Sequence, residues 1–388
     1  MGALLGLILL AAVPAAALEP RVETDPRLDL MGLVARLSGD PSAARNPFSD
    51  AAAKRFARAA KHPAVTGLSA MRATGFTLVT AAQYSVYLSS LPALVQVHPI
   101  PDFFAQKAGG RERLEAWRRN LAAFARESGF AEWEAETRAE RDSMAGLVRA
   151  AQGGRDLAAP LVRLLGVRTW SDWRVAVSAF YPAGGGASWV LEEKEGLPEV
   201  FVAYGPYWNR AKSHGGSASD FAVGAWPEAA FTLAYAMSEA CRPALLSGGR
   251  ACRGLKGLPE GEDCYQRHWV HAVVAKLLTE EYGAAAAREY HVQGPATAFD
   301  APIARALAVS AADRARSPDL LMATPLLAAP LRDDRRAPVC LFIDPNRFGE
   351  RVYARRLLYY LEARLSQRPD AELEPVRAEL IYLRGEKK

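Results

Sequence analysis

The sequence predicts a predominantly helical α+β protein in which a small mixed or antiparallel sheet packs among helices. Two observations favour this class. Apolar residues recur at helical spacing through most of residues 18–165 and again after residue 227. Between these regions, residues 173–224 hold short alternating segments that are typical of strands. Because these strands do not alternate regularly with helices, a doubly wound α/β fold is not expected.

The first 165 residues are expected to be mostly helical after an extended entry at residues 20–30. Capping and helix-breaking residues set the expected bounds: Ser49 caps the second helix, and His62-Pro63 ends it. The expected helices are 29–37, 50–61, 63–71, 77–88, 105–129, 133–152 and 155–165.

The sheet is expected to hold four strands, followed by a central helix at residues 227–246 that begins at Pro227. The expected strands are 173–181, 187–192, 199–204 and 220–224. A helix at 264–282, a short strand at 338–343 and an amphipathic helix at 350–366 are expected after the central helix. No linker separates the helical region 18–165 from the α+β region 166–388, so we expect one continuous structural unit.

Residues 1–17 are expected to be a secretory signal peptide. A short apolar run ends in small residues before Glu19, which favours cleavage after Ala15 or Ala17. The alternative is a membrane anchor, but the run is shorter than the roughly 20 residues of a spanning helix, and Pro14 interrupts it. We therefore expect an exported bacterial protein, periplasmic or extracellular, with no stable membrane span after cleavage.

The charge of the chain argues against a nucleic-acid partner. The formal net charge is +5, and only nine of the 48 basic residues are lysine. No stripe of basic residues interleaved with aromatic residues is present, whereas such stripes are typical of nucleic-acid interfaces.

Four cysteines in an exported chain suggest disulfide bonds. Cys252 and Cys264 are the preferred pair because they close a polar, glycine-rich loop, and Cys241 with Cys252 is the main alternative. Cys340 lies in an apolar run and is expected to be a buried free thiol.

Several segments, in this order, resemble a bacterial family of exported proteins known as domain of unknown function 4932. They are Asp25–Gly39, His62–Val65, Gly75-Phe76, Tyr87–Ser89 and Val200–Pro206. The resemblance implies a zincin-like metallopeptidase framework, whose central helix carries His-Glu-x-x-His. Residues i and i+4 share a helix face, so two imidazoles bind one zinc ion while the Glu acts as general base.

This chain departs from that motif at each position. The sequence has no His between His214 and His268. Aligning the motif on Ser238 places Tyr235, Ala236 and Glu239 at the positions of His, Glu and His; aligning it on Pro243 places Ala234, Tyr235 and Ser238 there. An ordinary zinc mechanism is therefore not expected here, and no cofactor is expected.

Residues beside the former zinc position are the candidate site. Glu239 and Tyr235 are the candidate catalytic residues, and Ser238, Tyr204 and Trp226 are candidates for lining a binding cleft. Each has a structural alternative: Glu239 suits a solvated or arginine-paired carboxylate, and the aromatic residues suit core packing.

His268 and His271 form a weaker candidate for a metal site. They lie three residues apart on one expected helix, with Cys264 one turn earlier. Zinc is expected only if these two His bind it.

The leading hypothesis is an exported, catalytically inactive metallopeptidase-like protein, a pseudoenzyme that binds a peptide or protein in the former active-site cleft. One alternative is an active hydrolase that uses a displaced metal site or a mechanism without metal. A second alternative is a structural protein of the cell envelope.

Overall fold

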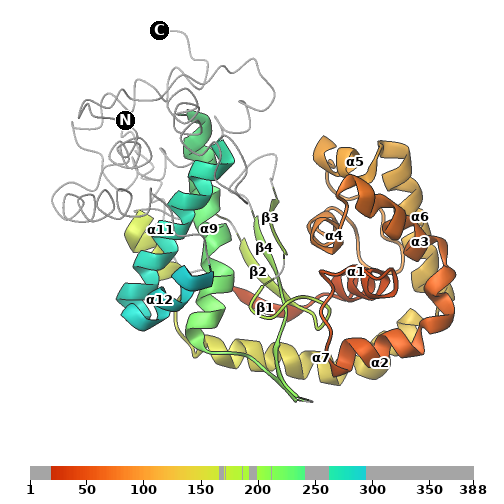
Figure 1. Cartoon of the computed structure of the whole chain (residues 1–388), viewed down its shortest axis with the longest axis horizontal. Helices are drawn as coiled ribbons and strands as arrows, with labels where there is room; N and C mark the ends of the chain where they lie inside the picture. Colours follow the sequence, from red (N-terminus) through yellow and green to blue (C-terminus); the bar gives the residue numbers. More distant parts are fainter. Residues whose placement is uncertain are drawn as a thin grey trace, which may run out of the picture.

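The computed structural model describes residues 19–165, 170, 172–185, 187–191, 199–210, 212–240 and 262–293. It confirms the α+β class, because many helices surround a four-stranded mixed sheet and a two-stranded hairpin. In Figure 1 the sheet lies between two groups of helices, with α9, α11 and α12 on one side and α1 and α3–α6 on the other. The predicted signal peptide and the elements predicted at 338–343 and 350–366 lie outside the described residues.

The region before residue 165 is helical, as predicted, apart from one short strand. Its α-helices are α1 (Pro26–Leu37), α2 (Pro47–Arg55), α3 (Pro63–Met71), α4 (Leu78–Ser85), α5 (Asp102–Ala108), α6 (Arg111–Glu127), α7 (Phe130–Gln152) and α8 (Ala158–Leu165). Two 3₁₀ turns, Ala57–Lys61 and Arg72–Thr74, follow α2 and α3. The cap predicted at Ser49 is wrong: Asn46 is the N-cap, and Ser49 is the third helical residue of the same capping box.

The sheet contains β1 (Arg21–Thr24), β2 (Asp172–Val177), β3 (Ala187–Leu191) and β4 (Glu199–Tyr204) in the order β1-β2-β4-β3. Strands β1, β2 and β4 are parallel, and β3 is antiparallel to β4. Since β1 comes from the start of the helical region, that region and the α+β region share one sheet. A hairpin of β5 (Tyr207–Asn209) and β6 (Lys212–His214) follows β4.

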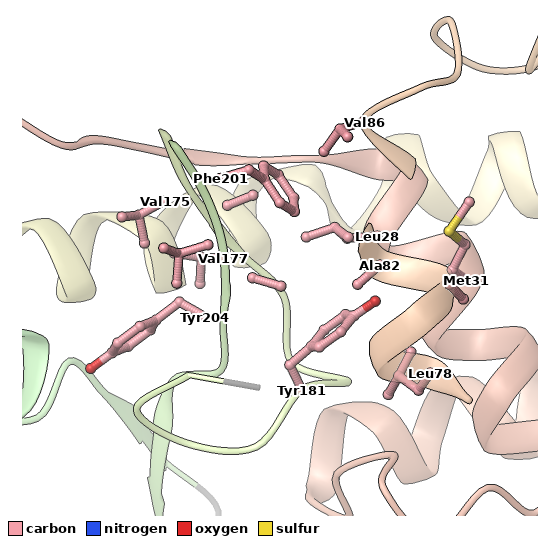
Figure 2. Close-up of a cluster of buried hydrophobic side chains, with 14 of the residues drawn as sticks. Leu28, Met31, Leu78, Ala82, Val86, Val175, Val177, Tyr181, Phe201 and Tyr204 are labelled. Carbon is pink, nitrogen blue, oxygen red and sulfur yellow. The ribbon is translucent and has the colours of Figure 1, made fainter. Parts of the chain in front are cut away.

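The period-two alternation of the strands decides which helices each face of the sheet contacts. Val175 is opposite Val202, and Val177 is opposite Tyr204, whose ring contacts Phe221 in α9. Residues on the other face include Phe201, which lies near Leu28 of α1 in Figure 2. Trp189 of β3 is paired with Phe201, so its side chain lies on this second face, toward α4 and α5.

The strand predicted at 220–224 is wrong, and so is the helix start at Pro227. Helix α9 runs from Ala218 to Ala240 and contains Pro227. Ser217 and Asp220 begin it with a reciprocal pair of hydrogen bonds, Ser217 N to Asp220 Oδ2 at 2.7 Å and Asp220 N to Ser217 Oγ at 3.1 Å. The stripe that α9 buries has helical spacing: Phe221, Ala222, Ala225, Trp226, Ala229 and Ala230.

Two further helices cover α9. Helix α11 (Glu262–Tyr282) packs against α9 and α8, and α12 (Ala284–Gln293) packs against α11. Helix α7 contacts β1, β2 and α9, and it runs beneath both groups of helices in Figure 1. The packing around the sheet is close enough to need glycine at Gly32, where a Cβ atom would lie 2.3 Å from the Cβ atom of Phe180.

Candidate functional site

Three residues of the predicted site lie near the end of α9. Tyr235, Ser238 and Glu239 belong to this helix, and their spacing of i, i+3 and i+4 places them on one face of it. Their side chains lie outside the described residues. Their catalytic and binding roles therefore stay predictions.

Tyr204 and Trp226, predicted to line a cleft, are both fully buried, Tyr204 between β4 and α9 and Trp226 on the side of α9 that meets Leu157 and α11. The Trp226 indole donates a hydrogen bond to the Leu157 carbonyl oxygen at 2.8 Å, and its ring packs on Tyr282. Burial raises the pKa of Tyr204 far above its ordinary value. In the described structure these two side chains are part of the core.

The predicted metal and disulfide residues are only partly described. His271 is buried in α11, and its ring stacks on Tyr290 of α12 with centroids 4.5 Å apart. The side chains of His268 and Cys264, also in α11, and the whole of Cys252 lie outside the described residues. Among the residues that the structure describes, no group of three His, Cys, Asp or Glu could hold a metal ion.

A buried cluster of polar groups that the sequence did not predict lies at the carboxyl ends of β1 and β2. This polar cluster comprises Asp25, Asp29, Arg141, Ser178 and Tyr181, each at most 5% exposed. Asp25 follows β1 and caps α1, and Ser178 follows β2. Such an edge of parallel strands is where open α/β sheets usually bind ligands.

Asp25 is held in its charged form. Its carboxylate accepts hydrogen bonds from Arg27 Nε at 2.9 Å and Arg27 Nη2 at 2.6 Å. Burial alone would raise the pKa of Asp25, but the hydrogen bond and charge of Arg27 outweigh it and lower the pKa below its ordinary value. The same guanidinium donates to the carbonyl oxygens of Ser85 and Leu88, so this ion pair fastens α1 to the end of α4.

At Asp29, one helical turn later, burial outweighs the hydrogen bonds and charges that favour the ionised carboxylate. Burial raises its pKa to about 6, although Arg141 and Ser178 act against this rise. Arg141 Nη1 donates to Asp29 Oδ2 at 3.0 Å, while Nη2 of the same guanidinium contacts the carboxylate of Glu134. Asp29 Oδ1 accepts no hydrogen bond from the described residues. One guanidinium therefore serves two carboxylates.

Tyr181 completes the polar cluster. Its hydroxyl is buried and has no hydrogen-bond partner among the described residues. Burial raises its pKa, and so do the nearby carboxylates of Asp29, Asp25 and Asp40. Figure 2 shows the hydroxyl directed toward Leu28 and Ala82, away from the direction that Tyr204 takes. The carboxylates and hydroxyl groups of the polar cluster are thus enclosed by α1, α4 and the segment after β2.

A second feature lies on the α5 side of β3. Trp189 donates a hydrogen bond from its indole to the Tyr87 hydroxyl at 2.6 Å, and its ring stacks on Phe103 with centroids 6.0 Å apart. Val97 donates its backbone N–H to the Tyr87 carbonyl oxygen, and Val95 accepts from the Ser89 N–H. We call Trp189, Phe103, Val95 and Val97 the β3 apolar surface.

The β3 apolar surface holds most of the large apolar side chains that the described structure exposes. Val95 is 51% exposed, Val97 52% and Phe103 38%; the remaining one, Leu147, is on α7 and is 38% exposed. The sequence shows that apolar and polar residues alternate at Val95, Gln96 and Val97. Their exposure, however, depends on a turn of the chain that pairs Gln96 with Leu88 in an antiparallel bridge. The sequence alone could not have identified this surface.

The comparisons with known proteins add no assignment. No family model, curated protein or solved structure matches the chain. Among the described residues, no helix is long and apolar enough to cross a membrane.

Proposed function

We propose that this protein is an exported, non-catalytic, metallopeptidase-like protein that binds an extended peptide along strand β3. The observation that carries the proposal is the coincidence of a sheet-edge strand with the β3 apolar surface. Export rests on the signal-like residues 1–17. The absence of catalysis rests on the central helix, which has Tyr235, Ala236 and Glu239 where the family that it resembles has His, Glu and His.

The position of β3 favours an extended ligand. Within the described residues, β3 is hydrogen-bonded on one side only, to β4. The other side of an edge strand presents N–H and C=O groups from alternate residues, and a peptide in strand conformation satisfies them as a further strand. Helix α9 contacts both β3 and β4, so such a peptide would lie next to the helix that the resemblance associates with zinc.

The side chains beside β3 favour apolar ligand residues. Trp189 and Phe103 form a stacked pair. Val95 and Val97 are exposed apolar residues of a turn that bonds to the backbone of Tyr87 and Ser89, and the Tyr87 hydroxyl accepts from Trp189. An apolar peptide side chain placed here removes apolar area from water, which contributes about 25 cal/mol for each Å² buried. Backbone pairing would then supply affinity, and this surface would supply preference for apolar sequences.

The test is a binding screen with purified protein on an array of ten-residue peptides that differ in hydrophobicity. We expect peptides with alternating apolar residues to bind, and the double substitution Val95→Lys, Val97→Lys to weaken their binding at least tenfold. Leu147→Lys is the matched control, because Leu147 is an exposed apolar residue outside the β3 apolar surface. An array without binders, or equal weakening by both variants, would contradict the proposal.

A further inference from the structure

Asp29 stands apart from Asp25 because its carboxylate accepts fewer hydrogen bonds. Asp25 has Arg27 as its own partner. Asp29 shares Arg141 with Glu134, and Arg141 also donates to the Glu134 carbonyl oxygen at 2.7 Å. Asp29 keeps one hydrogen bond from Arg141, at Oδ2, while its Oδ1 is buried without a donor among the described residues, and a buried charge with so few donors is costly.

The two carboxylates that share Arg141 differ in their exposure to water. The side chain of Asp29 is 1% exposed and that of Glu134 is 15% exposed. Burial alone would raise the pKa of Glu134, but Arg141 and Arg138, which also contacts Glu134, outweigh it and lower that pKa. Glu134 thus has a second cation and more contact with water than Asp29, so Asp29 is the carboxylate of the two whose charged form is stabilised less.

The other groups around Asp29 do not supply a second cation. From the segment after β2 it faces the hydroxyl groups of Ser178 and Tyr181, which are neutral. Asp25, before α1, adds a further negative charge that Arg27 balances. Asp40, after α1, accepts its hydrogen bonds from Ser42 and from the Leu78 N–H.

We propose that Asp29 is a buried proton-binding site, at which a proton from solvent and the Arg141 guanidinium compete for one carboxylate. In the protonated form Asp29 is neutral, and Arg141 pairs with Glu134 alone. In the ionised form Arg141 divides between the two carboxylates. Because Asp29 is on α1, Arg141 on α7 and Ser178 after β2, the proton changes the bonding at the junction of these three elements.

The direction of the effect on stability follows from the sign of the pKa change. The pKa of Asp29 is raised from 3.8 to about 6, so the folded protein binds this proton more tightly than the unfolded chain does. The contribution to stability is present at low pH and is lost as pH rises toward and past 6. Asp25 has a lowered pKa, so its contribution is present at neutral pH and is lost only in acid.

The experiment compares chemical unfolding of the full-length protein and Asp29→Asn from pH 4 to pH 7.5. The Asn variant resembles the protonated form and cannot ionise. We expect the unfolding equilibrium constant of the unmodified protein, relative to that of Asp29→Asn, to rise up to about 100-fold over this range. Asp25→Asn is the control, and its ratio to the unmodified protein should stay constant between pH 5 and 7.5.

A ratio for Asp29→Asn that does not change with pH, or that changes in the opposite direction, would overturn the proposal. If Asp29→Asn does not fold, the unmodified protein still decides the question. With ¹³C-labelled aspartate, the side-chain carboxyl resonance of Asp29 should titrate with a midpoint near pH 6. A midpoint below pH 4 would show that Asp29 is an ordinary ion-paired carboxylate.

Discussion

The polar cluster and the β3 apolar surface are two regions of one sheet with opposite properties. At the carboxyl ends of β1 and β2, the titratable groups Asp25, Asp29 and Tyr181 are enclosed by packed helices. Beside β3, the exposed side chains of the β3 apolar surface are apolar, and the Lys107 ammonium lies 5.6 Å from the centre of the Phe103 ring. The buried acids of the polar cluster are thus separate from the apolar side chains beside β3, which is why we propose binding and not catalysis at β3.

The largest expected effect concerns the charge inside the polar cluster. Arg141→Ala leaves the buried Asp29 carboxylate without its cation, so we expect a loss of about 3 kcal/mol in the free energy of unfolding at pH 7. Urea denaturation measures it, and the loss should shrink at pH 5, where Asp29 is protonated. Arg55→Ala, which removes an exposed ion pair with Glu136, is the control and should change stability little. A loss at Arg141 as small as at Arg55 would mean that the polar cluster is solvated.

The next effect tests how tightly α1 closes this edge of the sheet. Gly32→Ala would place a Cβ atom 2.3 Å from the Cβ atom of Phe180, so we expect it to destabilise the protein by about 2 kcal/mol. Gly146→Ala is a matched control, because Gly146 is inside α7 with no atom within 4 Å of its Cβ position. There alanine should stabilise by about 1 kcal/mol through helix propensity. Thermal unfolding measures the change in stability of both variants. A change of the same sign at Gly32 and Gly146 would contradict the close packing at Gly32.

A smaller effect is expected at Tyr181. Its hydroxyl makes no hydrogen bond with the described residues, so Tyr181→Phe removes a buried polar group without breaking a bond. We expect a change in the free energy of unfolding of less than about 0.5 kcal/mol, or a slight stabilisation. A loss above about 1 kcal/mol in urea denaturation would show that the hydroxyl has a partner.

The elements that depend on local sequence were predicted best. The predicted bounds of α3 at 63–71 and β4 at 199–204 agree with the structure, because prolines and turn residues flank them. The start of α9 was missed because Pro227 was interpreted as a first helical residue, although the apolar stripe from Phe221 onward already has helical spacing. Strand β1 was missed because it has only four residues and pairs with β2 far along the chain.

Neither the polar cluster nor the β3 apolar surface could be derived from the sequence. The burial of Asp29 depends on Arg141, which is 112 residues away, and a carboxylate on an exposed helix face would look the same in the sequence. The β3 apolar surface joins residues from the turn before α5 and from β3, again distant in the chain. The sequence did identify the absence of His from the central helix, α9. This absence is the reason to expect no zinc chemistry there.

Binding of an extended peptide along β3 can be observed at the strand itself. Hydrogen exchange of the backbone amides in 187–191, measured with and without the tightest-binding peptide from the array, tests it most directly. We expect alternate amides of β3 to exchange more slowly with peptide bound, while the amides of β1, at the opposite edge of the sheet, are unchanged. Unchanged exchange throughout β3, with peptide bound, would show that the peptide does not bind along this strand.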